Sequence, residues 1–147
     1  AYIRHPMLPW KLLLLAAMTI AGAVVAAQAE AREYAAQRNL NHIVLTLLRI
    51  AAASLAIRLM GRPENPWVFC MSMIYMAGIF GPIHRTTLNL VRINTYKVRI
   101  PWYHLGTQSK LDSLARTLWM GNEKLAFLSM CILETIIAGA MYSQLTP

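Results

Sequence analysis

Apolar residues in this chain form four long blocks that are separated by short polar segments. A bilayer core about 30 Å thick is crossed by roughly 20 residues of helix, and the blocks have about this length. Because backbone groups in lipid must be hydrogen-bonded internally, we predict an all-α integral membrane bundle of three or four transmembrane helices, forming a single domain over residues 1–147. The predicted spans are residues 10–28, 40–60, 67–83 and 125–145.

The longest polar segment, residues 84–124, is predicted to be a basic loop between the third and fourth spans. Its basic residues are Arg85, Arg92, Lys97, Arg99, Lys110, Arg116 and Lys124. Near its end, Leu111, Leu114, Ala115 and Leu118 recur at helical spacing, and Ser109 is placed to cap a helix. This pattern predicts an interfacial amphipathic helix before the last span. The Ala-rich residues 29–39 are expected to extend the first helix beyond the membrane surface.

Composition agrees with a membrane protein and adds a strong positive charge. The chain is 57% hydrophobic and 14% charged, whereas about 25% of a soluble domain is charged. Its formal net charge of +8 suits either anionic lipid or nucleic acid. The apolar blocks favour anionic lipid at the basic loop, and nucleic acid stays an open alternative. The preference for basic residues on the inner side of membranes would produce the same excess with no ligand.

The distribution of Lys and Arg predicts the orientation of the chain. The third connection has seven of them, each earlier connection has two, and none follows Lys124. With four spans, the first and third connections share the cytoplasm-like side, which then holds nine basic residues against four outside. Both termini are predicted to lie outside. Arg4 and Lys11 precede the first block as in a secretory signal, but we interpret this block as an uncleaved span.

The tryptophans lie at block edges or in the basic loop. This placement is typical of side chains that anchor a protein at the lipid headgroups, so we predict interfacial anchors at Trp10, Trp67, Trp102 and Trp119. Gly78 and Gly81 either admit a neighbouring helix closely or reflect the higher glycine content of membrane helices.

Arg49 and Glu134 are the charged residues nearest the middle of a predicted span. Because a charge in lipid is costly unless it meets a partner or water, we predict that they form an intramembrane charge pair between the second and fourth spans. The pair would fix helix register or serve a proton or ion relay in which Glu134 titrates. Either residue could instead pair with a neighbouring subunit.

Motifs for chemistry are not evident in the sequence. His5, His42, His84 and His104 have no metal-ligand spacing, and both cysteines lie in apolar blocks. No Gly-rich phosphate loop or nucleophile elbow is present. We therefore expect no metal site, no cofactor and no enzymatic activity.

Two stretches, Asn89 to Arg92 and Trp102 to Asp112, follow a pattern of an Asn-Leu-x-Arg-like segment and an aromatic, Leu-Gly-Thr-x-Ser-x-x-Asp run before a last span. This pattern resembles that of small uncharacterised multi-pass membrane proteins of bacteriophages or phage-like elements. The resemblance implies a phage origin and places the chain in a bacterial inner membrane or a virion's internal membrane. It carries over no catalytic residues.

The sequence favours a structural function over two alternatives. The first expectation is a non-catalytic multi-pass component that assembles with itself or with other membrane subunits, such as a viral structural protein. The alternative is a pore-forming, lysis or ion-transport protein. A further alternative is an accessory subunit of a respiratory or photosynthetic membrane complex.

Overall fold

The computed structural model describes residues 7–61, 65–106 and 110–147, which are helical throughout apart from turns and connections. The helices are α1 (Pro9–Ala35), α2 (His42–Leu59), α3 (Pro66–Asn94), α4 (Lys110–Leu118) and α5 (Glu123–Leu145). Four of them, α1, α2, α3 and α5, are long and apolar enough to cross a membrane. The predicted all-α bundle is confirmed, with four candidate spans.

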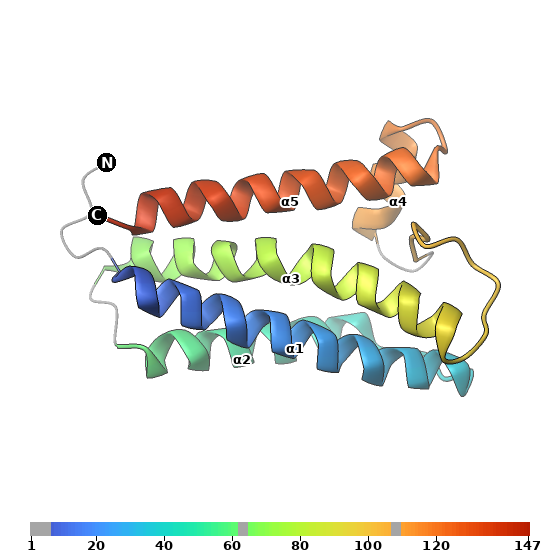
Figure 1. Cartoon of the computed structure of the whole chain (residues 1–147), viewed down its shortest axis with the longest axis horizontal. Helices are drawn as coiled ribbons and strands as arrows, with labels where there is room; N and C mark the ends of the chain where they lie inside the picture. Colours follow the sequence, from blue (N-terminus) through green and yellow to red (C-terminus); the bar gives the residue numbers. More distant parts are fainter. Residues whose placement is uncertain (1–6, 62–64, 107–109) are drawn as a thin grey trace.

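Helix α3 lies at the centre of the bundle (Figure 1). Helices α1 and α5 pack along it, α2 packs less closely against α3 and α1, and α4 packs on α5. Helix α1 begins and α5 ends at one end of the bundle. The opposite end holds the α1–α2 connection, residues 95–106 and α4. We call this opposite end the basic end.

Small side chains allow α1 to lie close to α3. Ala23, Ala27 and Ala31 recur every four residues on α1 and are fully buried. Small residues at this spacing let two helix backbones approach each other. Nearer the start of α1, the Tyr75 hydroxyl donates a hydrogen bond to the Leu12 carbonyl at 3.2 Å. This interface therefore extends along most of α1.

Glycines allow α5 to lie equally close to α3. A Cβ atom added to Gly78 would lie 2.6 Å from the Glu134 carbonyl oxygen and 3.0 Å from the Ala138 Cβ. A Cβ atom added to Gly81 would overlap the Glu134 carboxylate. Of the two interpretations of these glycines, the structure supports the close approach of a neighbouring helix.

Asparagine side chains cap three helix starts. The side-chain oxygens of Asn41, Asn65 and Asn122 accept backbone N–H groups in the first turns of α2, α3 and α5. Pro9 and Pro66 occupy the first positions of α1 and α3, where a missing N–H costs nothing. These caps explain why the helix starts lie within two residues of the predicted spans.

The predicted basic loop is wrong in its first part, because α3 continues to Asn94. Pro82 lies inside this helix. A proline removes one helical hydrogen bond, but membrane helices tolerate it where neighbouring helices support the backbone. His84 and Arg85 are therefore fixed on a helix within the bundle. The expected continuation of α1 past residue 28 is confirmed as far as Ala35, and its position beyond the membrane surface stays a prediction.

The helix predicted before the last span is present as α4, and the proposed cap Ser109 lies outside the described residues. Ala115 is buried against Phe127 and its neighbours. Leu111, Leu114 and Leu118 are 58%, 55% and 72% exposed. The leucines of α4 thus point away from the bundle. The position of α4 at a membrane interface stays a prediction.

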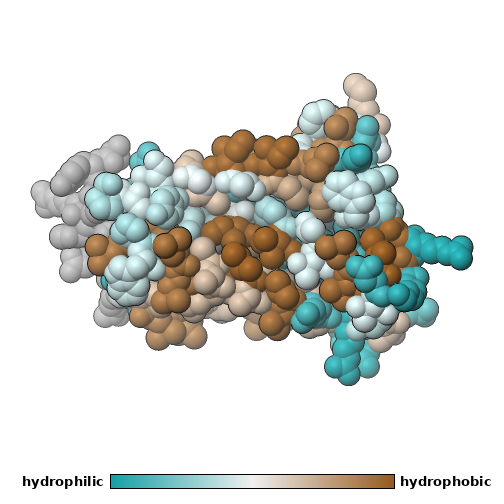
Figure 2. Space-filling model, viewed as in Figure 1, coloured by the Kyte–Doolittle hydropathy of each residue, from teal (hydrophilic) through white to brown (hydrophobic). Residues whose placement is uncertain are grey.

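Apolar side chains also cover much of the outside of the bundle. Figure 2 shows hydrophobic residues along the middle of the visible face and hydrophilic residues gathered at the basic end. Large apolar side chains exposed on the four long helices include Leu13, Ile20, Val25, Leu47, Ile50, Leu55, Ile74, Ile132, Leu133 and Ile136. Lipid tails are the solvent that this surface suits.

Candidate functional site: a charged pocket at the basic end

One buried carboxylate joins three helices near the basic end. Glu30 of α1 binds Arg49 of α2 and His84 of α3. The Arg49 guanidinium also lies 4.9 Å from the centre of the Phe80 ring, which stacks on the His84 imidazole at 5.0 Å. Glu30 is 6% exposed, so its charge is compensated by protein groups.

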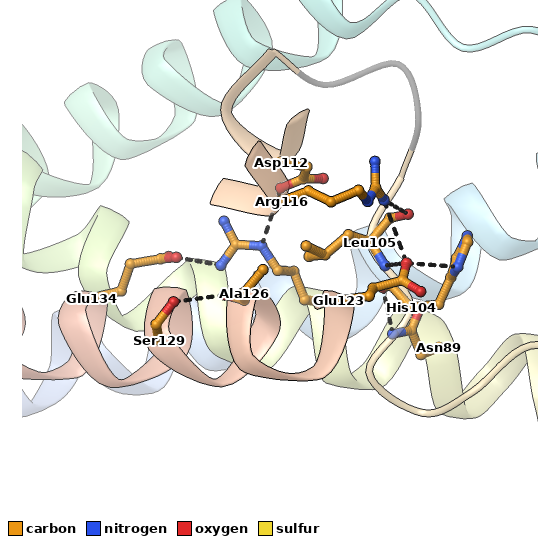
Figure 3. A network of polar contacts seen from close by, with 10 residues as sticks. Asn89, His104, Leu105, Asp112, Arg116, Glu123, Ala126, Ser129 and Glu134 are labelled. Carbon is orange, nitrogen blue, oxygen red and sulfur yellow. Dashed lines mark hydrogen bonds and ion pairs between the residues drawn. The ribbon is translucent and has the colours of Figure 1, made fainter. Parts of the chain in front are cut away.

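A second carboxylate joins α5 to α3. Glu134 accepts a hydrogen bond from Arg85, and the Arg85 Nε lies 3.9 Å from an Asp112 carboxylate oxygen of α4 (Figure 3). The absence of a side chain at Gly81 provides the space that the Glu134 carboxylate occupies. Arg85 therefore links α3 to α4 and α5.

The predicted charge pair of Arg49 with Glu134 is wrong within the single chain. Each residue forms its ion pair with a different partner, Glu30 and Arg85 respectively. The physical reason is that α3 lies between α2 and α5 (Figure 1), so α3 and α1 supply the nearer partners. Pairing of either residue between subunits is not tested by a single chain.

Residues 101–106 are held against α3 by a buried amide. Asn89 is 3% exposed, and its Nδ2 donates hydrogen bonds to the carbonyls of Trp102 at 2.7 Å and His104 at 2.9 Å (Figure 3). Both hydrogens of one amide group thus fix this part of the chain. The resemblance to phage membrane proteins included Asn89, but its structural function follows only from these contacts.

Glu123, in the first turn of α5, holds the same segment from the other side. Its carboxylate accepts the Leu105 N–H at 2.8 Å and contacts Arg116 at 3.3 Å and the His104 Nδ1 at 3.2 Å. Arg116 also donates to the Leu105 carbonyl at 3.0 Å. Fully buried Leu105 is thereby fixed at both of its backbone polar groups (Figure 3).

Two ionisable groups outside the long helices have shifted pKa values. Burial lowers the pKa of His104, with Arg92 and Arg116 adding to the effect, although the Glu123 carboxylate acts in the opposite direction. A neutral imidazole can still donate its Nδ1–H to Glu123. Burial raises the pKa of Asp112, while the nearby Arg85 and Arg116 oppose this shift.

These groups surround a polar pocket of about 270 Å³. We call it the charged pocket. It is lined by three arginines, three histidines and two carboxylates, which come from four helices and from the segment between α3 and α4. With neutral histidines the lining has a formal charge of +1. These residues are Arg49, Arg85, Arg92, His42, His84, His104, Glu30 and Asp112.

Arg92 is the arginine of this lining that pairs with no carboxylate among the described residues. Its guanidinium lies 4.9 Å from the centre of the Tyr34 ring, which also lines the pocket. Its Nε is buried and has no hydrogen-bond partner in the part of the chain that the structure describes. An unsatisfied buried donor costs free energy, and no carboxylate among the described residues compensates the charge of this guanidinium.

The structure divides the seven basic residues assigned to the loop. Arg85 and Arg116 bind carboxylates of the chain itself, and their contact with lipid or phosphate stays a prediction. Arg92 is half-buried against Tyr34 and lines the charged pocket. The remaining four side chains are exposed at the basic end: Lys97, Arg99, Lys110 and Lys124.

The tryptophans are divided between the two ends of the bundle. Trp10 and Trp67 begin α1 and α3 at one end, whereas Trp102 and Trp119 belong to the basic end. All four are exposed, between 43% and 72%. Their function as interfacial anchors stays a prediction.

Sequence reasoning missed Glu30 as the central carboxylate of the site. Its signal was present, because Glu30 continues the face of α1 on which Thr19, Ala23 and Ala27 are buried. No comparable signal marked Asp112, since its side chain meets Arg85 only through tertiary packing. Among the described residues, no group of three or more His, Cys, Asp or Glu side chains could hold a metal ion.

Comparison with known proteins adds no assignment. No family model matches the chain, and no curated protein or solved structure is detectably similar to it.

Proposed function

We propose that this chain is a non-catalytic structural component of a membrane, where it assembles with copies of itself or with other chains. The observation that supports the proposal is that charged groups inside the bundle join helices. Glu30 and Glu134 together connect α1, α2, α3 and α5 through Arg49, His84 and Arg85. Charged groups of a polar path would instead line a cavity through the membrane.

The basic end is proposed to face the cytoplasm, or the equivalent interior, and to contact anionic lipid headgroups. Lys97, Arg99, Lys110 and Lys124 are exposed there, and each basic residue near an anionic surface adds attraction. Nucleic acid is the alternative partner of these side chains. The resemblance to phage proteins favours a virion's internal membrane, where this end would face the genome, or a bacterial inner membrane.

The first test is the composition of the intact assembly. The complex is extracted in mild detergent, its mass is measured, and co-purifying proteins and nucleic acid are identified. A structural component should arrive in a defined assembly with itself or with viral proteins. A monomer without partners would contradict the proposal. Co-purification with redox subunits would instead identify an accessory subunit of a respiratory or photosynthetic complex.

A structural function also predicts the effect of removing the charge of Glu30. Glu30→Gln should lower the free energy of unfolding by about 3 kcal/mol, because Arg49 loses its buried carboxylate partner. The matched control is Glu33→Gln, since Glu33 pairs with Arg38, whose side chain is 69% exposed. That change should stay within about 1 kcal/mol. Denaturation in mixed micelles, followed by circular dichroism, measures the free energy of unfolding of both variants. If the two variants lose the same amount of stability, the proposal is contradicted.

Ion transport or lysis is the second candidate, and the charged pocket is the observation that favours it. Its 270 Å³ of polar space opens near one membrane surface between several titratable groups. The test is ion flux through vesicles that contain the purified chain. A structural component should pass no more ions than empty vesicles. A leak that Glu134→Gln abolishes, in a variant that still folds, would replace the first proposal by this one.

A further inference from the structure

The charged pocket adjoins a larger apolar cavity within the bundle. This cavity of about 630 Å³ lies between α1, α2 and α3, and its volume is within the range of small-molecule sites, about 300–1,000 Å³. Small residues such as Gly22, Ala26 and Ala53 leave the space open. Glu30 and Arg49 line both cavities, so the two form one site with a polar part and an apolar part.

The apolar cavity is open to the outside of the bundle. Leu48 and Ile50 line it and are 61% and 48% exposed. On a membrane-spanning bundle, this outer surface meets lipid tails. An apolar chain could therefore enter the cavity sideways from the bilayer without crossing a polar surface.

The charged pocket extends from the basic end into the bundle. The 27 residues of α1 span about 40 Å, which exceeds a hydrocarbon core of about 30 Å. His42 begins α2 and His104 lies beyond the end of α3, and both line the outer part of the pocket, whereas Glu30 and Arg49 lie at its inner end. The charged pocket is thus placed where lipid phosphates lie, and the apolar cavity extends from it toward the bilayer centre.

The charges at the junction favour an anion. Arg49 already compensates Glu30, whereas Arg92 pairs with no carboxylate among the described residues and has a buried Nε without a partner there. Arginine is well suited to phosphate because its planar donors match the oxygen atoms. A phosphate next to an apolar chain is the chemistry of a phospholipid.

We propose that an anionic phospholipid binds at this junction, with its phosphate in the charged pocket beside Arg92 and Arg49 and one acyl chain in the apolar cavity. The inference rests on the proposed placement of the basic end at an anionic membrane surface. It adds a specific site, distinct from the general attraction of the exposed lysines. The lipid would brace α2, which otherwise packs less closely than the other long helices.

The test is lipid retention by the full chain purified in mild detergent, measured by native mass spectrometry. Phosphatidylglycerol should stay bound, and phosphatidylcholine should bind more weakly. Arg92→Gln should weaken phosphatidylglycerol retention about tenfold, since one hydrogen bond to a charged group is lost. The matched control is Arg38→Gln, because Arg38 is exposed in the α1–α2 connection at the same end and lines neither cavity; this change should leave retention unchanged.

A second variant tests the apolar part independently. A Cβ atom added to Gly22 or to Gly139 would meet nothing within 4 Å, but of these two glycines Gly22 alone lines the cavity. Gly22→Phe should therefore displace the acyl chain and abolish retention, whereas Gly139→Phe should leave it intact. If Arg92→Gln fails to fold, as judged by circular dichroism, this pair of variants decides the outcome.

Three results would overturn the inference. The first is that phosphatidylcholine is retained as well as phosphatidylglycerol, and the second is that Gly22→Phe retains phosphatidylglycerol fully. The third is that inorganic phosphate at an equal concentration displaces the lipid, which would mean that the site binds free phosphate. The proposed structural function fails on different measurements. A leaking chain that still retains the lipid would refute that function and leave the lipid site in place.

Discussion

Gly81 is the residue at which α3 makes room for a charged side chain of α5. Its missing Cβ leaves the space that the Glu134 carboxylate occupies, with the Arg85 guanidinium beside it. The side chains of Glu134 and Arg85 are only 20% and 18% exposed. If either moved into solvent, the other would be left as an unpaired charge that is largely buried. Gly81 is thus required for the ion pair between Glu134 and Arg85 to form in this place.

Gly81→Ala should lower the free energy of unfolding by about 1–3 kcal/mol, the usual cost of overpacking. The control is Gly22→Ala, where nothing lies within 4 Å of an added Cβ. That change should be neutral or stabilising by up to ~1 kcal/mol, since alanine favours helix more than glycine does. Denaturant titration of both variants in the same detergent measures the difference. A Gly81 variant as stable as the Gly22 variant would show that the Glu134 carboxylate does not fill the space beside Gly81.

At the scale of elements, residues 101–106 and α4 form a cover on the basic end that is held by Asn89, Arg116 and Glu123. Its attachment should depend on pH. The lowered pKa of His104 means that its contribution to stability is present above the ordinary histidine value, about 6.5, and is lost as the pH falls through the lowered value.

Acidification from pH 7.5 to pH 5, values chosen on either side of about 6.5, should therefore lower the protection factors of the amides in residues 101–106, that is, their exchange relative to the intrinsic rate at each pH should increase. Asp112 acts in the opposite sense, because its raised pKa gives a contribution that is present at low pH and lost as the pH rises. The variant His104→Gln separates the two effects, since it retains a donor for Glu123 without a titrating group. The protection factors of this variant should change less with pH. If they change as much as those of the unaltered chain, the effect belongs to another group.

For the whole molecule, the distribution of charge predicts the orientation of the bundle in a membrane. The basic end holds both the α1–α2 connection and the segment between α3 and α5, which contain Arg38, Lys97, Arg99, Lys110 and Arg116. The adjoining parts of α1, α3 and α5 add Arg32, Arg85, Arg92 and Lys124. Positively charged connections stay on the cytoplasmic side. The beginning of α1 and the end of α5 then lie together on the opposite side.

Cysteine labelling tests this orientation in a variant whose Cys70 and Cys131 are replaced by alanine. Exposed positions are available at both ends, at Arg99 and Ser143. In intact bacterial spheroplasts, a membrane-impermeant maleimide should label Ser143→Cys but should label Arg99→Cys only after permeabilisation. The reverse pattern would invert the proposed topology, and labelling of both in intact cells would indicate mixed orientations.

The sequence by itself determined the fold class, a bundle of three or four apolar spans, and the α4 helix, and the structure has four candidate spans. Each of these depends on local composition: an apolar block of sufficient length must be helical in lipid, and α4 follows from the spacing of Leu111, Leu114 and Leu118. Asn and Pro near the helix starts act within one turn. Orientation also rests on counting charges in the connections, and it stays a prediction.

Only the tertiary structure decided which charged groups meet. Arg49 and Glu134 have opposite signs and similar settings in the sequence, but α3 separates their helices and provides His84 and Arg85 as contacts. The continuation of α3 through Pro82 also depends on neighbouring helices that sequence spacing does not reveal. Two charged side chains pair only if they lie within a few ångströms of each other. In a bundle, that proximity depends on which helices pack together.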